Sequence, residues 1–309
     1  MTSPHAELSF SGLSDRGVVR EHNEDSFRLA PPYFVVADGM GGHARGEVAS
    51  RAAVECFTPE EGQDWAEIDQ VRAAIARAGQ QVAALDDSAL RPPGTTLTGA
   101  ALTLQDGQPA WLIFNIGDSR TYLLRGGVLT QVSVDHSARA EHPGADLPRN
   151  VITRALGGGI KPPVFADQWI LAIEPGDRLL ICSDGLYTEL DDTALGTYLI
   201  SNPQPADAVS ALVNAAIEAG GRDNVTCVVV AADAVTAGDS TGAAGDAVAG
   251  AAAGAVAGAV AGVVPGVVPG VVPAGLDDTT EDAPEGETNT NFASLSAENF
   301  ASMSADEEA

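Results

Sequence analysis

Residues 33–42 read Tyr-Phe-Val-Val-Ala-Asp-Gly-Met-Gly-Gly, an apolar run that stops at an aspartate followed by glycines. The same pattern returns at 111–118 (Trp-Leu-Ile-Phe-Asn-Ile-Gly-Asp) and at 178–185 (Arg-Leu-Leu-Ile-Cys-Ser-Asp-Gly). Apolar runs of this length, closed by turn residues, predict buried strands. We therefore expect Asp38 and Asp184 to lie at strand ends, held by a rigid sheet but facing out of it.

Five short acidic motifs extend this pattern along the chain: HNED at 22–25, DGMGG at 38–42, GDSR at 117–120, SDG at 183–185 and DN at 223–224. Carboxylates gathered from such distant segments repel one another, and burial without a partner raises their pKa values. Hard divalent cations remove this conflict, and aspartate with backbone oxygen suits Mg²⁺ or Mn²⁺. The three cysteines are unclustered, which disfavours zinc, and we interpret them as reduced core residues.

Each motif also has a plainer interpretation. Asp-Gly is a common turn, so the pairs at 38–39 and 184–185, taken singly, are more often structural. The Asp-Asn pair at 223–224 can likewise be a turn before a strand over 225–231. It is the combination of motifs, in this order and with their flanking residues, that favours a metal site.

In that combination the motifs resemble the metal-dependent protein phosphatases of type 2C, the PPM class, in their bacterial form. The resemblance covers roughly residues 8–232. The matching stretches are SDRGVVREHNEDSF (14–27), VVADGMGGHARGEVAS (35–50), PPGTTLTGA (92–100), NIGDSRTYLLRGGVLTQVSVDHS (115–137), VITRALGG (151–158), GDRLLICSDGL (176–186) and GGRDNVTCVVV (220–230).

The resemblance implies a set of metal ligands. It makes Asp38 the carboxylate that bridges two Mn²⁺ or Mg²⁺ ions, with the Gly39 carbonyl oxygen on the first ion. Asp184 and Asp223 would bind the second ion. Asp118 resembles the ligand of a third, weaker ion found in bacterial members.

It also implies catalytic roles nearby. Glu24 would act through metal-bound water, Asp25 would orient that shell, and Arg20 would bind the phosphate. Members of the animal type carry a histidine directly after the Asp-Gly pair, whereas this chain has Met40, and His43 is not equivalent. We therefore expect metal-bound water, and no histidine, to protonate the leaving group.

The chemistry can also be argued from residue types. A hydroxide shared by two cations forms near neutral pH and attacks phosphorus in line, while an arginine fork clamps the phosphoryl oxygens. The chain contains no Cys-x5-Arg loop, no Gly-x-Ser-x-Gly elbow and no Walker-type phosphate loop. Covalent catalysis by Cys182 or Ser183 is thereby disfavoured.

The spacing of apolar residues predicts an α+β fold with antiparallel sheets. Helical spacing covers 46–57, 65–85 and 205–219. Strands are expected over 95–104, 111–116, 121–125 and 128–132, the last two joined by a hairpin at Gly126-Gly127. The resemblance sharpens this to a four-layer αββα sandwich of two antiparallel sheets flanked by helices, with the metals at one edge. Trp111 and Trp169 are expected to pack in its core.

The segment 137–153 departs from the resemblance. Bacterial relatives usually carry a longer, charged, helical flap there, whereas this stretch is short and interrupted by Pro143 and Pro148. We expect a compact flap and an altered substrate preference.

The sequence predicts three parts: a catalytic domain over 1–235, a linker over 236–276 and an acidic, disordered tail over 277–309. The linker contains an uncharged Ala/Gly/Val stretch at 247–276 that is long enough to span a bilayer. Its prolines and the absence of flanking basic or aromatic residues favour a flexible linker over a membrane anchor.

The formal net charge of −27 makes nucleic acid an improbable partner, because phosphate binding needs a basic surface. Residues 1–7 lack both a basic start and an apolar run, so we expect no signal peptide and a cytoplasmic catalytic domain.

We therefore predict a monomeric, metal-dependent protein serine/threonine phosphatase that uses two Mn²⁺ or Mg²⁺ ions, with a third possible. The resemblance implies that it acts on phosphorylated proteins and opposes bacterial Ser/Thr kinases. Two alternatives stay open: a non-catalytic relative that binds phosphoproteins, and a hydrolase of small phosphoesters.

Overall fold

The structure is a computed structural model that describes residues 3–41, 45–85, 92–145, 147, 151–238 and the short strand at 268–269. The elements are β1 (His5–Asp15), β2 (Asp25–Ala30), β3 (Tyr33–Met40), α1 (Arg45–Glu55), α2 (Ile68–Ala83), β4 (Gly94–Thr95), β5 (Leu97–Gln105), β6 (Gln108–Ile116), β7 (Arg120–Arg125), β8 (Val128–Gln131), α3 (Ala138–Glu141), β9 (Leu156–Gly157), β10 (Asp167–Ala172), β11 (Arg178–Cys182), α4 (Asp184–Tyr187), α5 (Asp192–Ser201), α6 (Pro205–Ala219), β12 (Val225–Thr236) and β13 (Val268–Pro269).

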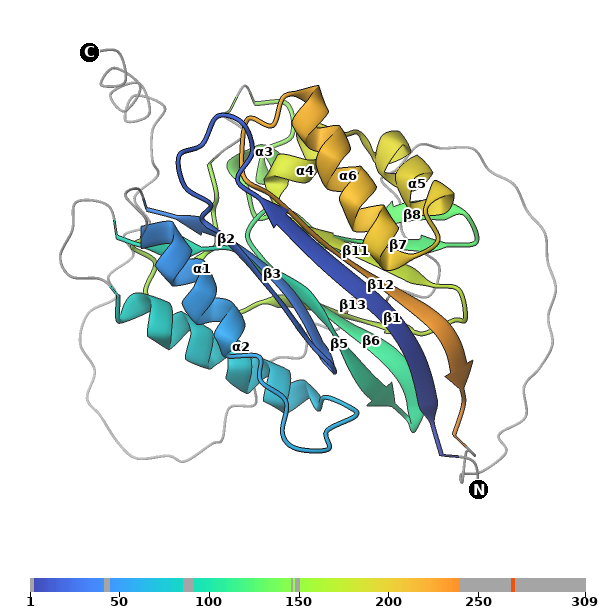
Figure 1. Cartoon of the computed structure of the whole chain (residues 1–309). Helices are drawn as coiled ribbons and strands as arrows, with labels where there is room; N and C mark the ends of the chain where they lie inside the picture. The colour runs from blue at the N-terminus through green and yellow to red at the C-terminus, as the bar shows by residue number, and fades with distance from the viewer. Residues whose placement is uncertain are drawn as a thin grey trace, which may run out of the picture. The chain divides into compact units, whose positions relative to one another are not determined.

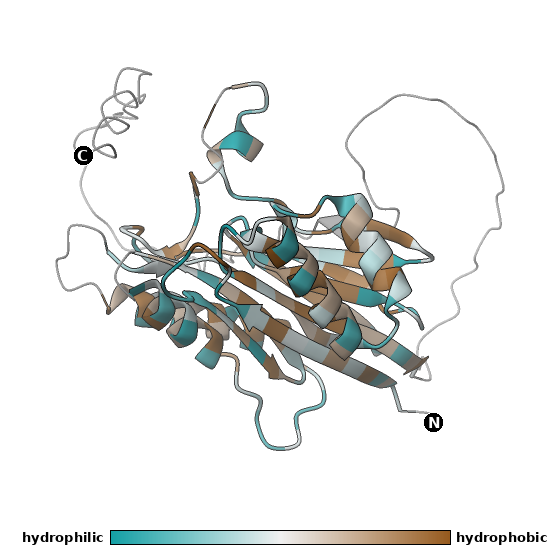
Figure 2. Ribbon diagram, turned by 45° about the horizontal axis from the view of Figure 1, so that its top comes forward, coloured by the Kyte–Doolittle hydropathy of each residue, from teal (hydrophilic) through white to brown (hydrophobic). Residues whose placement is uncertain are grey.

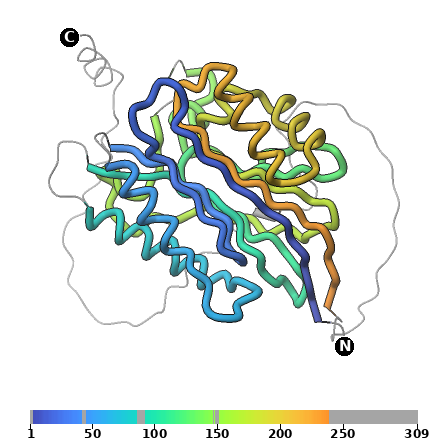
Figure 3. Tube along the Cα trace, in the orientation of Figure 1, coloured from blue at the N-terminus to red at the C-terminus, as the bar shows by residue number. Residues whose placement is uncertain are grey.

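Two antiparallel sheets form the two inner layers (Figure 1). The first sheet has the strand order β1-β12-β11-β7-β8, and the second has the order β13-β10-β6-β5-β3-β4-β9, with β2 paired to β3. Strand β1 lies beside β12, so that His5 is paired with Thr236 (Figure 3). The expected hairpin at Gly126-Gly127 is confirmed, because it joins the paired strands β7 and β8.

Helices cover both outer faces of this pair of sheets. Helices α1 and α2 pack on the second sheet, and α5 and α6 pack on the first (Figure 1). A third core lies between the sheets, where Phe34, Trp111 and Ile181 are fully buried. Figure 2 shows the apolar residues concentrated along the strands and the hydrophilic residues in loops and on the helices. The predicted four-layer αββα sandwich is confirmed.

Local sequence explains most element boundaries. Helix α6 has the predicted bounds, and the proline at its first position provides a pre-set backbone angle for a helix start. The helix predicted over 65–85 begins later, at Ile68, because Gln70 Oε1 accepts a 2.9 Å hydrogen bond from the Glu67 amide and so fixes the start there. The strand predicted over 95–104 is divided at Thr96, whose amide donates to the Asp38 carbonyl oxygen.

The position of Asp38 differs from the prediction, and most of the predicted linker and tail lies outside the described residues. Asp38 is not at a strand end: β3 continues to Met40, because β2 pairs with it on one side and β4 and β5 pair with it on the other. The linker and tail predicted over 236–276 and 277–309 lie outside the described residues, apart from 236–238 and 268–269.

The part of the chain that the structure describes has no helix long and apolar enough to cross a membrane. The Ala/Gly/Val stretch at 247–276, for which the sequence left an anchor open, is outside that part except for 268–269. All three cysteines are buried and unpaired, as expected.

Candidate metal centre

Carboxylates from five segments meet around the C-terminal half of β3. Asp38 lies directly opposite Asp25 in the β2–β3 ladder, a placement that costs free energy for two like charges. The pKa of Asp38 is raised well above its ordinary value, first by burial and then by repulsion from four other carboxylates: Asp25, Asp184, Asp118 and Asp223. The fold therefore brings together acids that are up to 198 positions apart in the sequence, between Asp25 and Asp223.

Close backbone packing makes this convergence possible. A side chain at Gly39 would overlap the carbonyl oxygens of Gly46 and Glu24, so only glycine lets β3 pass the start of α1. A side chain at Gly185 would overlap the carbonyl oxygen of Asn224 in the same way. The glycines that follow Asp38 and Asp184 are thus needed for packing, and Gly39 lies within β3, not in a turn.

Asn224 ties the loop before β2 to the loop before β12. Its side-chain nitrogen donates to the carbonyl oxygens of Arg16 and His22, at 2.9 Å each, and its oxygen accepts from the Glu24 amide at 2.8 Å. Sequence reasoning named the Asp-Asn pair but assigned a role only to Asp223. The signal was present in the motif, but the partners of Asn224 are about 200 positions away.

Asp25 is buried in a polar network that leaves one of its oxygens without a partner. Ser183 Oγ donates to Asp25 Oδ2 at 2.7 Å and accepts from the Thr226 amide at 3.1 Å. Asp25 Oδ1 has no hydrogen-bond partner among the described residues. Burial raises the pKa of Asp25 to about 7, against the hydrogen bonds with Thr226 and Ser183, which lower it.

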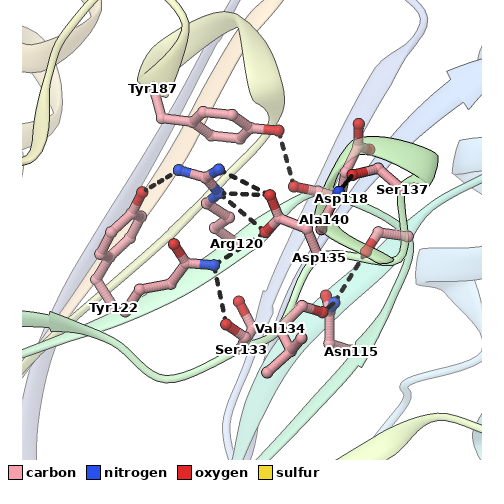
Figure 4. Close-up of polar contacts among 12 residues, drawn as sticks. Asn115, Asp118, Arg120, Tyr122, Ser133, Val134, Asp135, Ser137, Ala140 and Tyr187 are labelled. Carbon is pink, nitrogen blue, oxygen red and sulfur yellow. Dashed lines mark hydrogen bonds and ion pairs between the residues drawn. The ribbon is translucent and has the colours of Figure 1, made fainter. Parts of the chain in front are cut away.

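Asp118 is buried in the turn between β6 and β7 and is braced by an aromatic and cationic cluster (Figure 4). The Tyr187 hydroxyl donates to the Asp118 carbonyl oxygen at 2.9 Å, and the Arg120 guanidinium lies 3.7 Å from the centre of the Tyr187 ring. Arg120 in turn holds Asp135 through Nε and Nη2. Tyr187 ends the short helix that Asp184 begins, so this brace connects two predicted metal ligands.

The pKa values of the two braced acids show the cost of bringing them together. The pKa of Asp118 is raised to about 7, first by burial and then by Asp184. Burial and then Asp223 raise the pKa of Asp184 to about 6, while Arg20 acts in the opposite direction. Sequence reasoning missed Tyr187 as part of this region, because its hydroxyl acts on a backbone atom 69 positions away.

Arg20 and Glu24 lie at the exposed side of the cluster. Arg20 Nη2 donates to Asp223 Oδ2 at 2.7 Å, and half of the Arg20 side chain is exposed. Attraction from Asp223, Asp38 and Asp184 raises the pKa of Arg20 against the effect of burial. Glu24 turns its carboxylate toward the start of α1, where Oε1 accepts from the Gly46 amide at 3.1 Å. His43, which is not equivalent to the histidine of the animal type, lies outside the described residues.

The chemistry of the donors fits a hard divalent cation. All the clustered donors are carboxylate oxygens, and one buried oxygen of Asp25 lacks a partner. Within the described ranges, no three histidine, cysteine, aspartate or glutamate side chains already form a complete ligand set for a metal ion. The repulsion among these carboxylates is the term that bound cations would cancel.

Comparison with known proteins assigns the class. A family model described as Protein phosphatase 2C matches residues 19–219, so the chain belongs to the protein phosphatase 2C family. Within that family it is similar to the serine/threonine phosphatase stp of Listeria monocytogenes, with 33% identity over 257 residues that cover 74% of this chain and 96% of stp. It is also 38% identical over 239 residues to PstP of Mycobacterium tuberculosis, a match that covers 72% of this chain and 44% of PstP.

Solved structures agree with the fold. The crystal structure of the M. tuberculosis phosphatase PstP/Ppp matches with a TM-score of 0.64 and 34% identity, covering 74% of this chain and 99% of that chain. The PstP catalytic domain in complex with two manganese ions matches with a TM-score of 0.63 and 34% identity, covering 72% and 97% respectively.

Proposed function

We infer that this protein is a metal-dependent serine/threonine protein phosphatase, which hydrolyses phosphoserine and phosphothreonine in proteins. The observation that carries this inference is the convergence on Asp38 of carboxylates from four other segments, with raised pKa values at Asp38, Asp118 and Asp184. A protein that bound no cations would gain nothing from concentrating this charge. The names of stp and PstP, and the manganese ions in the PstP structure, support the same function.

We propose that Asp38, Asp184, Asp223 and the Gly39 carbonyl oxygen hold two Mn²⁺ or Mg²⁺ ions, and that Asp118 holds a third. Two ions in such a site supply a hydroxide near neutral pH and neutralise charge on the phosphoryl oxygens. The protein itself provides the positions. Asp38 is held by the pairing of β3 with β2, Asp184 by the start of α4, and Asp223 by the loop before β12.

The remaining predicted residues act around these ligands. Arg20 is half exposed and paired with Asp223, so its guanidinium is placed where it would bind the phosphoryl oxygens of a substrate. Asp25, fixed by Ser183, and Glu24, fixed at the start of α1, are placed to orient water beside Asp38.

We also propose that the substrates are phosphorylated proteins in the cytoplasm, where bacterial Ser/Thr kinases would supply them. The support is the resemblance of the sequence to bacterial phosphatases and the names of the relatives.

Phosphate release from phosphothreonine and phosphoserine peptides tests this function. We expect turnover with Mn²⁺ and none after chelation. An Asp184→Asn variant should lose turnover, whereas Asp69→Asn, whose side chain is 91% exposed on α2, should keep it. Peptide binding without turnover would instead identify a binding module, and faster hydrolysis of nucleotides or sugar phosphates would identify a small-molecule phosphoesterase.

A further inference from the structure

The strand β11 begins with a buried arginine that the phosphatase chemistry does not use. Arg178 is paired with Leu124 of β7 on one side and with Ala231 of β12 on the other, and only 8% of its surface is exposed. Alternation along the strand places it on the same face as Leu180 and Cys182, which pack beneath α5 and α6. Four steps of about 3.3 Å separate it from Cys182, so Arg178 lies roughly 13 Å away from the end of β11 that precedes Asp184.

One edge of this guanidinium has no partner. Nη1 donates to the Leu199 carbonyl oxygen near the end of α5. Nε and Nη2 are buried, and neither has a hydrogen-bond partner among the described residues. Burial lowers the pKa of Arg178, and attraction from Asp233 opposes this only in part. A buried donor without a partner costs free energy, so this arrangement needs an explanation.

Three other arginines of the chain show what the Nε–Nη2 edge binds. In each of them Nε and Nη2 both donate to a single carboxylate, at distances between 2.6 and 3.2 Å: Arg120 to Asp135, Arg125 to Asp177 and Arg222 to Glu189. This geometry matches the two parallel N–H groups to the two carboxylate oxygens. In Arg28 the same two nitrogens donate to the Phe57 carbonyl oxygen and the Thr58 hydroxyl, so a carboxylate is the commoner complement of this edge and not its sole one.

A pocket lies over Arg178. Its volume is about 350 Å³, and it opens to solvent between the end of α5 and the central strands β7, β11 and β12 of the first sheet. Apart from Arg178 and Asp233, its walls are apolar or backbone: Leu124, Gly176, Ile200, Pro203, Ala231 and Ala232. Such a pocket has room for a small organic molecule with an apolar body and one charged group.

Asp233 limits the charge that the pocket accepts. It is the extra residue of a bulge in β12, where the register with β1 shifts between Glu7 and Leu8, and bulges re-aim side chains. Asp233 is exposed, lines the pocket and attracts Arg178, but it makes no hydrogen bond to the guanidinium. A dianion such as phosphate would meet this carboxylate at close range, whereas a monoanion would be repelled less.

We propose that this pocket is a binding site for a small organic monocarboxylate with an apolar body, whose carboxylate is held by Nε and Nη2 of Arg178. The apolar part lies against Leu124 and Pro203. Both nitrogens are shielded from solvent, so the ligand enters by displacing the side chains at the mouth. Ile200 lines the pocket and is 54% exposed. The site is separate from the metal centre and does not depend on the phosphatase activity.

Calorimetric titration of the full chain with benzoate, in the presence of Mn²⁺, tests the proposal. We expect saturable binding of benzoate and at least tenfold weaker binding of benzamide, its neutral counterpart. The Asp38→Ala variant should bind benzoate as the wild type does, which separates this site from the metal centre. Equal binding of benzoate and benzamide would overturn the proposal, and so would loss of benzoate binding in Asp38→Ala.

Two variants at the pocket complete the test. Arg178→Met should abolish benzoate binding. Because this variant removes a buried side chain and can fail to fold, Ile200→Trp provides a second test by filling the mouth from the surface, and it should weaken binding at least tenfold. Val128→Trp is the matched control, since Val128 is 65% exposed at the start of β8 and does not line the pocket. Wild-type binding in Ile200→Trp would contradict the proposal.

The Asp233→Asn variant distinguishes the proposal from an internal ion pair. We expect its melting temperature to stay within about 1 °C of the wild type and its benzoate affinity to rise severalfold, because a repelling charge is removed. A fall of several degrees would show that Asp233 is the partner of Arg178 in solution, and the pocket would then need no ligand.

Discussion

The two ends of strand β11 bury charge of opposite sign. Arg178 at the first end has one protein hydrogen bond and an Nε–Nη2 edge without a partner. Beyond the second end, Asp184 joins carboxylates that surround Asp38. At the first end a guanidinium edge without a partner lies beside walls that are apolar except for Asp233, whereas polar loops gather several anions at the other. The number and sign of the unbalanced charges therefore indicate different ligands: a monoanion at one end and divalent cations at the other.

Removing the central carboxylate is the strongest test of the acidic end. Asp38→Ala should lower the rate of phosphopeptide hydrolysis by about 10³-fold or more, because Asp38 is the proposed bridge between the two ions. It should also abolish the rise in melting temperature on addition of Mn²⁺. Asp69→Ala, at an exposed position on α2, is the control. A Mn²⁺-stabilised and active Asp38→Ala variant would remove the basis of the proposed site.

Without bound metal, repulsion among the carboxylates should make the free energy of unfolding depend on pH. The pKa of Asp118 is about 7 in the folded chain, above its ordinary value of 3.8. The folded state therefore binds more protons than the unfolded state between these values. The stabilising contribution of Asp118 is fully present below pH 4. As the pH rises from 4 toward 7, up to about 4 kcal/mol of the free energy of unfolding is lost through this one group.

Chemical denaturation of chelated protein between pH 5 and pH 8 measures this effect. We expect the free energy of unfolding to fall with rising pH, and saturating Mn²⁺ to flatten or reverse the trend. Measurements stop at pH 5 because other groups titrate below it. A chelated protein that is equally stable across this range would show that the acids are not held under mutual repulsion.

The loops at the acidic end depend on one amide side chain. Asn224→Ala removes three hydrogen bonds to the backbone at Arg16, His22 and Glu24, and should lower the free energy of unfolding by about 2–3 kcal/mol. Phosphatase activity should fall more steeply than stability alone explains, because these loops carry Arg20 and Asp223. Asn202→Ala, which removes a single hydrogen bond to Tyr198 at the end of α5, should have a smaller effect on both.

The smallest expected effect concerns the brace between Asp118 and Asp184. Tyr187→Phe deletes the hydroxyl that bonds the Asp118 carbonyl oxygen but keeps the ring beneath Arg120. A neutral hydrogen bond of about 1 kcal/mol predicts a roughly fivefold rise in the Mn²⁺ concentration for half-maximal activation, with little change in the maximal rate. Tyr198→Phe on α5 is the control. An unchanged Mn²⁺ dependence in Tyr187→Phe would show that the brace is only structural.

Much of the fold could be predicted because its signals are local. Helix α6 and strand β11 have their predicted bounds, since each has a clear apolar period and a proline, glycine or aspartate at its limits. Asp38 was placed at a strand end because Asp-Gly is typical of turns. The structure continues β3 past it, because strands on both sides supply hydrogen bonds that a local pattern cannot reveal.

The sequence predicted the acidic site near one end of β11 but not the buried arginine at the other end. The acids could be selected because five motifs repeat one pattern and resemble a known family. Arg178 was counted as the first residue of an apolar strand, because nothing beside it in the sequence indicates whether a carboxylate faces it. Asn224 and Tyr187 were missed as positioning residues for the same reason, since each acts on backbone atoms far away in the chain.

The alternation of strands and helices, and the residue types available for metal chemistry, follow from the amino-acid sequence alone, because apolar periodicity and turn residues act over a few positions. Which acids share one electrostatic environment, and which guanidinium edge is left without a carboxylate, follow from the folded arrangement. These properties depend on burial and on distances between side chains, and packing brings together residues that the chain separates by as many as 212 positions.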